Sequence, residues 1–90
     1  MSTLPLLYEK RDGIARITFN RPEARNAISP EVMVRLADAW VDFNEDPDLR
    51  VAIITGAGDQ AFSAGADLGR LIPLFTRARE PEDEWDRRAL

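Results

Sequence analysis

The sequence contains neither cysteine nor histidine. The lack of cysteine excludes disulfides, thiol nucleophiles and thiolate metal sites, and it fits a reducing compartment. The lack of histidine removes the commonest general base and the commonest transition-metal ligand. We therefore expect no metal site and no chemistry that depends on an imidazole or a thiol.

Positive charge and long apolar runs are also scarce. Lys10 is the only lysine, the net charge is −4 and the isoelectric point is about 4.7, which argues against a nucleic-acid partner. No stretch approaches the ~20 apolar residues of a membrane helix, and the start "MSTLPLLYEKRDG" lacks the basic region of a signal peptide. We expect no membrane partner and a cytoplasmic location.

The composition that remains is that of a small globular protein. The chain has 90 residues, of which 44% are apolar and 31% charged, so it holds at most one domain. The segment "LLYEKRDGIARITF" predicts a β-hairpin, because Asp12-Gly13 is a strong signal for a two-residue turn. After the turn, alternation places Ala15, Ile17 and Phe19 on one face of the strand.

A helix and a further strand follow the hairpin. Ser29 and Pro30 form a typical helix start, and Pro47 ends the helix. Val51–Thr55 is a continuous β-branched run, typical of a strand covered on both faces, and we expect a parallel crossover from the hairpin to it. The spacing predicts one apolar helical stripe made of Met33, Leu36, Ala37, Trp40 and Phe43.

The C-terminal part of the chain has a weaker pattern. Beyond Leu71, "IPLFT" is apolar and "REPEDEWDRR" is densely charged, which favours a loop or an exposed helix with only Trp85 to bury. We expect Arg70 to Leu90 to be mobile. The acidic residues of this run are expected to form a solvated face with no catalytic role; they are Glu80, Glu82, Asp83, Glu84 and Asp86.

Glycine-rich motifs after the last strand allow several interpretations. "GAGDQA" matches the G-x-G-x-x-A dinucleotide fingerprint, but Gly65 interrupts the helix that this fingerprint needs, and no Gly-Lys-Ser/Thr follows to make a P-loop. Taken alone, Gly56, Gly58 and Gly65 are expected to be turn glycines. The stretch "AFSAGADLGRL" therefore offers mainly backbone N–H groups for chemistry.

Two segments together, "FNRPEARNAIS" and "ITGAGDQAFSAGADL", closely resemble the enoyl-CoA hydratase/isomerase (crotonase) family, from about Tyr8 to Leu71. The resemblance implies an α/β fold of the crotonase-like (ClpP/crotonase) type, with this chain as the N-terminal ββαβα portion of a repeated ββα superhelix. Residues 1–90 would be the N-terminal part of one domain whose remainder is absent. It also implies a homo-oligomer, a trimer or hexamer.

The same resemblance assigns site residues. Ala66 would start a helix and donate its N–H to the thioester oxygen of an acyl-CoA, as half of an oxyanion hole, which agrees with the free N–H groups at a helix start. The CoA groove would be lined by Arg25, Ala27, Ala64, Ala66, Asp67 and Leu68. Asn26 is expected to fix its loop, Asp67 either binds ligand or caps a first helical turn, and Arg70 is expected to be solvated.

The function implied is acyl-CoA processing through a thioester enolate, with acyl-CoA as the substrate and no separate cofactor. Hydration of a 2-enoyl-CoA is the expected outcome, and double-bond isomerisation is the alternative within the family. In the family, a second oxyanion donor and the catalytic carboxylates lie in later segments, so activity would need them. A non-catalytic CoA-binding or interaction fragment is the alternative from another class.

Overall fold

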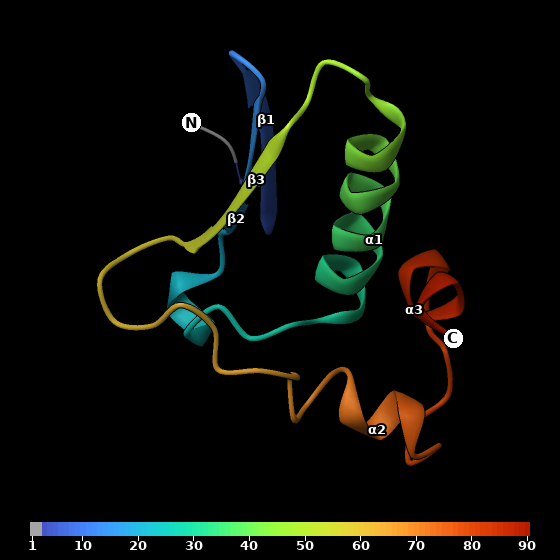
Figure 1. Cartoon of the computed structure of the whole chain (residues 1–90). Helices are drawn as coiled ribbons and strands as arrows, with labels where there is room; N and C mark the ends of the chain where they lie inside the picture. The colour runs from blue at the N-terminus through green and yellow to red at the C-terminus, as the bar shows by residue number, and fades with distance from the viewer. Residues whose placement is uncertain (1–2) are drawn as a thin grey trace.

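The computed structural model describes residues 3–90 as a three-stranded sheet with helices beside it (Figure 1). The elements are β1 (Leu6–Arg11), β2 (Ile14–Phe19), the 3-10 helix η1 (Pro22–Ala24), α1 (Pro30–Glu45), β3 (Val51–Gly56), α2 (Ile72–Phe75) and α3 (Glu84–Ala89). The strand order is β1-β2-β3.

The predicted hairpin is confirmed. β1 and β2 pair antiparallel, with Arg11 opposite Ile14, so Asp12 and Gly13 are the two turn residues. Their φ angles of 53° and 79° are the positive values that a type I′ turn needs. The face of β2 that carries Ala15, Ile17 and Phe19 is buried, as the alternation predicts.

The crossover from β2 to β3 is also confirmed. The Ser29 hydroxyl accepts a hydrogen bond from the Val32 N–H at 3.2 Å, which caps α1 where the sequence predicts its start. α1 runs beside one face of the sheet, and β3 returns parallel to β2 (Figure 1). The ends of β2 and β3 therefore lie at the same edge of the sheet.

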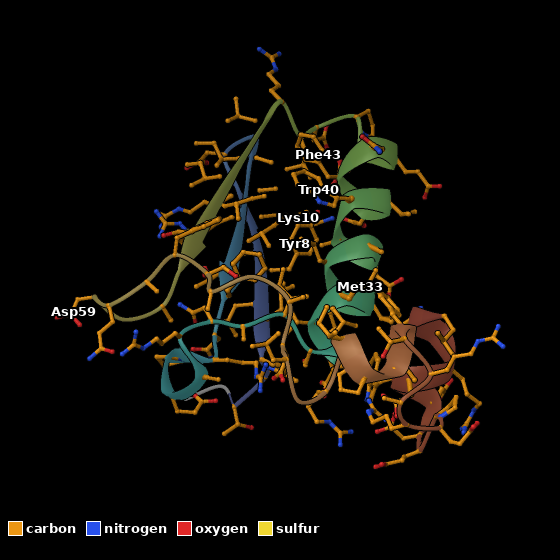
Figure 2. All side chains as sticks on the ribbon, turned by 90° about the horizontal axis from the view of Figure 1, so that it is seen from below. Tyr8, Lys10, Met33, Trp40, Phe43 and Asp59 are labelled. Carbon is orange, nitrogen blue, oxygen red and sulfur yellow. The ribbon has the colours of Figure 1, made fainter. Side chains whose placement is uncertain are left out.

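The predicted apolar stripe of α1 is only partly right. Trp40 and Phe43 point from α1 toward the sheet (Figure 2), and Leu36 packs against the core. Met33 and Ala37, however, are exposed, and Val32 and Ala39 are buried in the core instead. A second side of the helix is also covered, because α3 packs against α1 and Val34 is buried. The single-stripe prediction assumes that α1 packs against one surface, whereas α1 packs against both the sheet and α3.

The prediction that Val51–Thr55 is covered on both faces is not met within this chain. β3 lies at the edge of the sheet, and Val51 and Ile53 are 51% and 39% exposed on its outer face. Ile14 of β2 adds to this face at 40% exposure. An apolar strand edge of this kind favours association with other chain segments.

The expected solvated face at the C-terminus is wrong for Asp86. This carboxylate is 1% exposed and accepts two hydrogen bonds from the Arg79 guanidinium, at 2.6 and 2.9 Å. Trp85 lies against α1, with the Arg35 guanidinium 4.7 Å from its ring centroid. Hydrophobic periodicity does not predict this packing, because ion pairs and cation–π contacts hold the segment, together with the buried side chains of Leu71 and Leu74. The mobility of the segment stays a prediction.

Within residues 3–90, every helix is too short or too polar to cross a lipid bilayer.

We expect the chain of residues 1–90, expressed by itself, to associate through the outer face of β3. Ile53→Thr keeps a β-branched side chain, so it should change the free energy of unfolding by only about 0.5 kcal/mol while it weakens the association. Sedimentation over a range of concentrations would measure the association, and thermal unfolding would check the fold. A parent chain that is monomeric at every concentration and melts sharply would contradict this expectation.

The docking of α3 should depend on pH. Hydrogen bonds from Arg79 hold the pKa of the Asp86 carboxyl far below its usual range, against the opposing effect of burial. A carboxyl whose pKa is lower in the folded state stabilises the fold above about pH 4 and loses this effect as the pH falls. The fluorescence of Trp85, recorded in a Trp40→Phe background, should therefore change as α3 detaches in acid. Asp86→Asn should show the detached signal already at neutral pH, and an Asp86→Asn protein that keeps the parent signal at neutral pH would refute this role.

Candidate functional site

Two loops meet at the edge where β2 and β3 end. The loop after β2 and the loop after β3 run side by side, joined by a parallel bridge between Ile28 and Ala66. The Ile28 N–H donates to the Gly65 carbonyl at 2.8 Å, and the Asp67 N–H donates to the Ile28 carbonyl at 2.9 Å. We call this pairing of residues 25–28 with residues 63–67 the seam.

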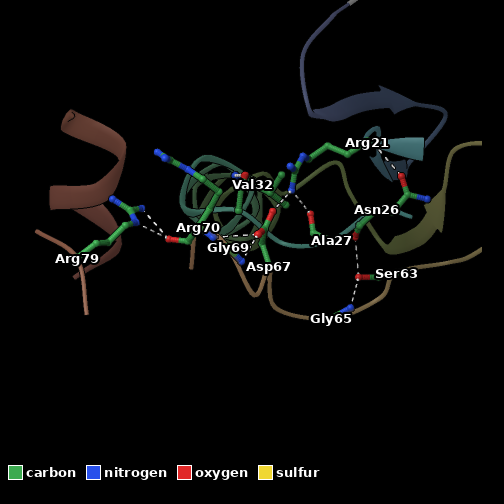
Figure 3. Close-up of polar contacts among 11 residues, drawn as sticks. Arg21, Asn26, Ala27, Val32, Ser63, Gly65, Asp67, Gly69, Arg70 and Arg79 are labelled. Carbon is green, nitrogen blue, oxygen red and sulfur yellow. Dashed lines mark hydrogen bonds and ion pairs between the residues drawn. The ribbon is translucent and has the colours of Figure 1, made fainter. Parts of the chain in front are cut away.

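Ser63 and Ala64 extend the seam. The Ala64 N–H donates to the Arg25 carbonyl at 2.9 Å. The Ser63 hydroxyl donates to the Asn26 carbonyl at 2.8 Å (Figure 3). The same hydroxyl accepts a hydrogen bond from the Gly65 N–H at 3.0 Å. The seam thus fixes the backbone on both sides of Gly65.

Asn26 fixes the two loops, as predicted. Its side chain is 1% exposed and accepts a hydrogen bond from the Arg21 N–H at 2.9 Å. Its amide donates to the carbonyls of Ala57 and Ala61 at 3.0 and 2.9 Å. Because every polar atom of the side chain has a protein partner, Asn26 holds the loops and does not offer a free group to a ligand.

Gly56 and Gly65 are needed for different reasons. A Cβ on Gly56 would lie 2.3 Å from the Phe62 carbonyl oxygen, so the loop after β3 can fold back only over a glycine. Gly65 has φ of +85°, which favours glycine, and nothing lies within 4 Å of the place where its Cβ would stand. The space beside Gly65 is therefore open to a ligand.

The prediction that Ala66 starts a helix is wrong. Ala66 is extended in the seam, and the next helix, α2, begins at Ile72. In this parallel bridge, Ile28 makes both hydrogen bonds, one to the residue before Ala66 and one to the residue after it. Ala66 itself therefore turns its N–H and C=O away from Ile28. The bridge, and not a helix dipole, therefore directs the Ala66 N–H outward.

The N–H of Ala66 differs from the N–H groups of the residues directly beside it. Those of Ala64, Gly65 and Asp67 all donate to protein acceptors. Within the described chain, the N–H of Ala66 has no acceptor, and the residue is exposed. Ser63 and Leu68 also have N–H groups without an acceptor in residues 3–90. Ala66 therefore presents a backbone donor of the kind that an oxyanion requires.

Asp67 makes protein contacts with both carboxylate oxygens. One oxygen accepts from the N–H groups of Gly69 and Arg70 at 2.8 and 2.9 Å, and the other accepts from Arg21 Nη1 at 3.1 Å. Burial raises the pKa of the Asp67 carboxyl, but these three donors outweigh it and hold the pKa below its usual range. The interactions favour a turn-capping role for Asp67 over a direct ligand role, although the cap closes the turn before α2 and not a helical turn begun by Ala66.

The remaining predicted groove residues lie on or beside the seam. Arg25 is exposed in a left-handed conformation, with φ of 53°, and it lines a cavity of about 320 Å³ together with the tip of the loop after β3. Ala27 and Ala64 contribute backbone groups to the seam region. Leu68 is 81% exposed and projects beyond the seam. Arg70 is about half exposed, as expected for a solvated arginine.

Arg21 and Ser63 both hold the seam, and the sequence does not predict these roles. Neither residue has a periodicity or charge pattern that would single it out. No cluster of three acidic side chains within residues 3–90 could hold a metal ion.

Comparison with known proteins shows the family to which the chain belongs. The family model for enoyl-CoA hydratase/isomerase matches residues 9–84, which is most of the chain. The chain belongs to this family. Both predicted motif segments lie inside the matched region.

Individual members of the enoyl-CoA hydratase/isomerase family support the assignment. The chain is 40% identical over 70 residues to an (E)-benzylidenesuccinyl-CoA hydratase from Thauera aromatica, covering 78% of this chain and 27% of that protein. A carnitinyl-CoA hydratase structure from Mycobacterium avium superposes with a TM-score of 0.74 at 37% identity, covering 88% of this chain and 29% of the other. An enoyl-CoA hydratase structure from Mycobacterium tuberculosis gives 0.71 at 45%, covering 81% and 27%.

These similarities confirm the crotonase-like fold class predicted from the sequence. They also show that the chain spans only about a quarter of the length of the relatives it matches.

Asn26 offers a test of the seam in this family fold. Asn26→Ala should destabilise the chain by about 1–3 kcal/mol for each buried polar group left without a partner. Asn26→Gly is the matched control, because it removes the same side chain but tolerates the φ of 58° at this position. Chemical denaturation would measure both variants. If Asn26→Gly restored the parent stability, strain and not hydrogen bonding would be the role of Asn26.

Proposed function

We propose that this chain forms the thioester-binding part of an acyl-CoA-processing enzyme, in which the Ala66 N–H donates to the thioester oxygen. The observation that carries the proposal is the unpaired, exposed N–H of Ala66 in the described chain, which lies between the paired N–H groups of Gly65 and Asp67. A donor fixed in this way needs little reorganisation when charge develops on an oxygen.

Hydration of a 2-enoyl-CoA is the reaction we favour. The oxygen of water would bond to C3 as one of its protons passes to a base. The C2–C3 π electrons would form the C1–C2 double bond of an enolate, and the carbonyl π pair would move to the thioester oxygen. Protonation of C2 would then restore the thioester carbonyl. The relatives named above are hydratases, which supports hydration over isomerisation.

Proton transfer in this reaction is assigned to groups outside residues 1–90. Asp67 is the carboxylate beside the donor, and both its oxygens already accept hydrogen bonds from the protein. A general base must reach the proton it removes, and Asp67 is committed to its turn. The longer family members have room for such groups, because this chain spans 27% of the Thauera protein.

We also propose that the protein is an oligomer and acts in the cytoplasm. The exposed Val51, Ile53 and Leu68 side chains support burial against further chain or another subunit. The lack of cysteine fits a reducing compartment.

Ala66→Pro tests the donor in the protein that carries this chain. Proline removes the N–H, and no hydrogen bond within the described residues is lost with it. Removal of one oxyanion donor typically lowers kcat by about 10²–10³-fold. Affinity for the CoA thioester should change much less, because the donor matters most once charge develops. The measurements are kcat on a short 2-enoyl-CoA and calorimetric binding of a saturated acyl-CoA.

Two controls accompany this variant. Ala66→Gly keeps the N–H, so it should lose far less turnover than Ala66→Pro. The melting temperature shows whether proline has disturbed Gly65, which precedes it. A fall in kcat of less than about threefold in a folded Ala66→Pro protein would exclude Ala66 as an oxyanion donor.

A further inference from the structure

Arg21 links the two loops of the seam with a single nitrogen (Figure 3). Its Nη1 donates to Asp67 at 3.1 Å and to the Ala27 carbonyl at 2.7 Å. These acceptors belong to opposite sides of the seam, and they flank the Ile28–Ala66 bridge. The side chains of Arg21 and Asp67 are only 20% and 15% exposed, so the contact is largely shielded from water.

The contact completes the set of restraints on Asp67. Its N–H donates to Ile28, its carbonyl accepts from Leu71 and Ile72, and one carboxylate oxygen caps the turn that follows. The other carboxylate oxygen has Arg21 as its partner. Without Arg21, this oxygen and the Ala27 carbonyl would each lose a charge-assisted hydrogen bond.

Asp67 also places a negative charge one residue from the proposed oxyanion donor. A carboxylate there opposes an enolate that forms on the same side of the loop, and the guanidinium of Arg21 compensates that charge. Arg21 thus influences both the direction of the Ala66 N–H and the charge beside it.

We propose that Arg21 is a positioning residue for the Ala66 donor and acts through Asp67 and Ala27 without touching the substrate. This inference rests on the proposed function of Ala66. It predicts that loss of Arg21 impairs turnover and leaves ground-state binding of the CoA portion nearly intact.

The test is a double-mutant cycle of Arg21→Met and Ala66→Pro in the protein that carries this chain, with a short 2-enoyl-CoA as substrate. Arg21→Met should lower kcat by about tenfold or more, since small displacements of catalytic groups are costly, while KM changes by less than about threefold. In the Ala66→Pro background the same change should cost almost nothing, because the donor that Arg21 positions is already absent.

Two matched variants separate positioning from general loss of structure. Arg21→Lys keeps a positive charge and N–H donors, so its kcat should lie between those of the parent and Arg21→Met. Arg50→Met removes an exposed arginine remote from the seam and should leave kcat and KM unchanged. Melting temperatures confirm that each variant is folded at the assay temperature.

The outcomes distinguish this inference from the proposed function. If Ala66→Pro lowers kcat strongly but Arg21→Met does not, the positioning role is overturned and the donor stands. Losses in kcat that multiply fully in the double variant also overturn it, because Arg21 would then act independently of Ala66. If Ala66→Pro itself has no effect on kcat, the proposed function fails first.

Discussion

Parallel hydrogen bonding between β2 and β3 places Phe19 opposite Gly56, so that both strands end at the same edge of the sheet. Every contact of the seam depends on that register, because the two loops leave the sheet side by side. A shift of one residue would also turn the buried face of β2, with Ile17 at 0% exposure, toward water. The hydrophobic core therefore fixes the register that brings Ile28 next to Ala66.

Much of this architecture could be predicted because short sequence motifs specify individual turns, helix starts and strand faces without help from the rest of the chain. Asp12-Gly13 specifies a turn, Ser29 and Pro30 specify a helix start, and alternation specifies the inner face of β2. The packing of α1 could not be predicted in the same way, because α3 covers a second side of this helix. The burial of Asp86 depends on one arginine seven residues away in the chain, and a charged segment does not reveal which of its ions will pair.

The candidate site shows the same division. Family motifs indicate the residue at the centre, Ala66, and the loop-fixing role of Asn26 follows from its residue type. The reason that Ala66 can donate was predicted wrongly, since a helix start was expected and a strand-like bridge is found. Both arrangements leave a backbone N–H free, so the motif points to the donor without determining its geometry. Arg21 and Ser63 act through single long-range contacts, which no local pattern reports.

The amide of Asn26 divides the loop after β3 into two parts. It binds the carbonyls of Ala57 and Ala61, which close the loop on either side of an exposed tip, with Asp59 outermost (Figure 2). Motion of the tip is therefore absorbed between the two anchored carbonyls and is not passed on to Ser63 and the donor beyond it. Displacement of the tip should therefore leave the position of the Ala66 N–H unchanged.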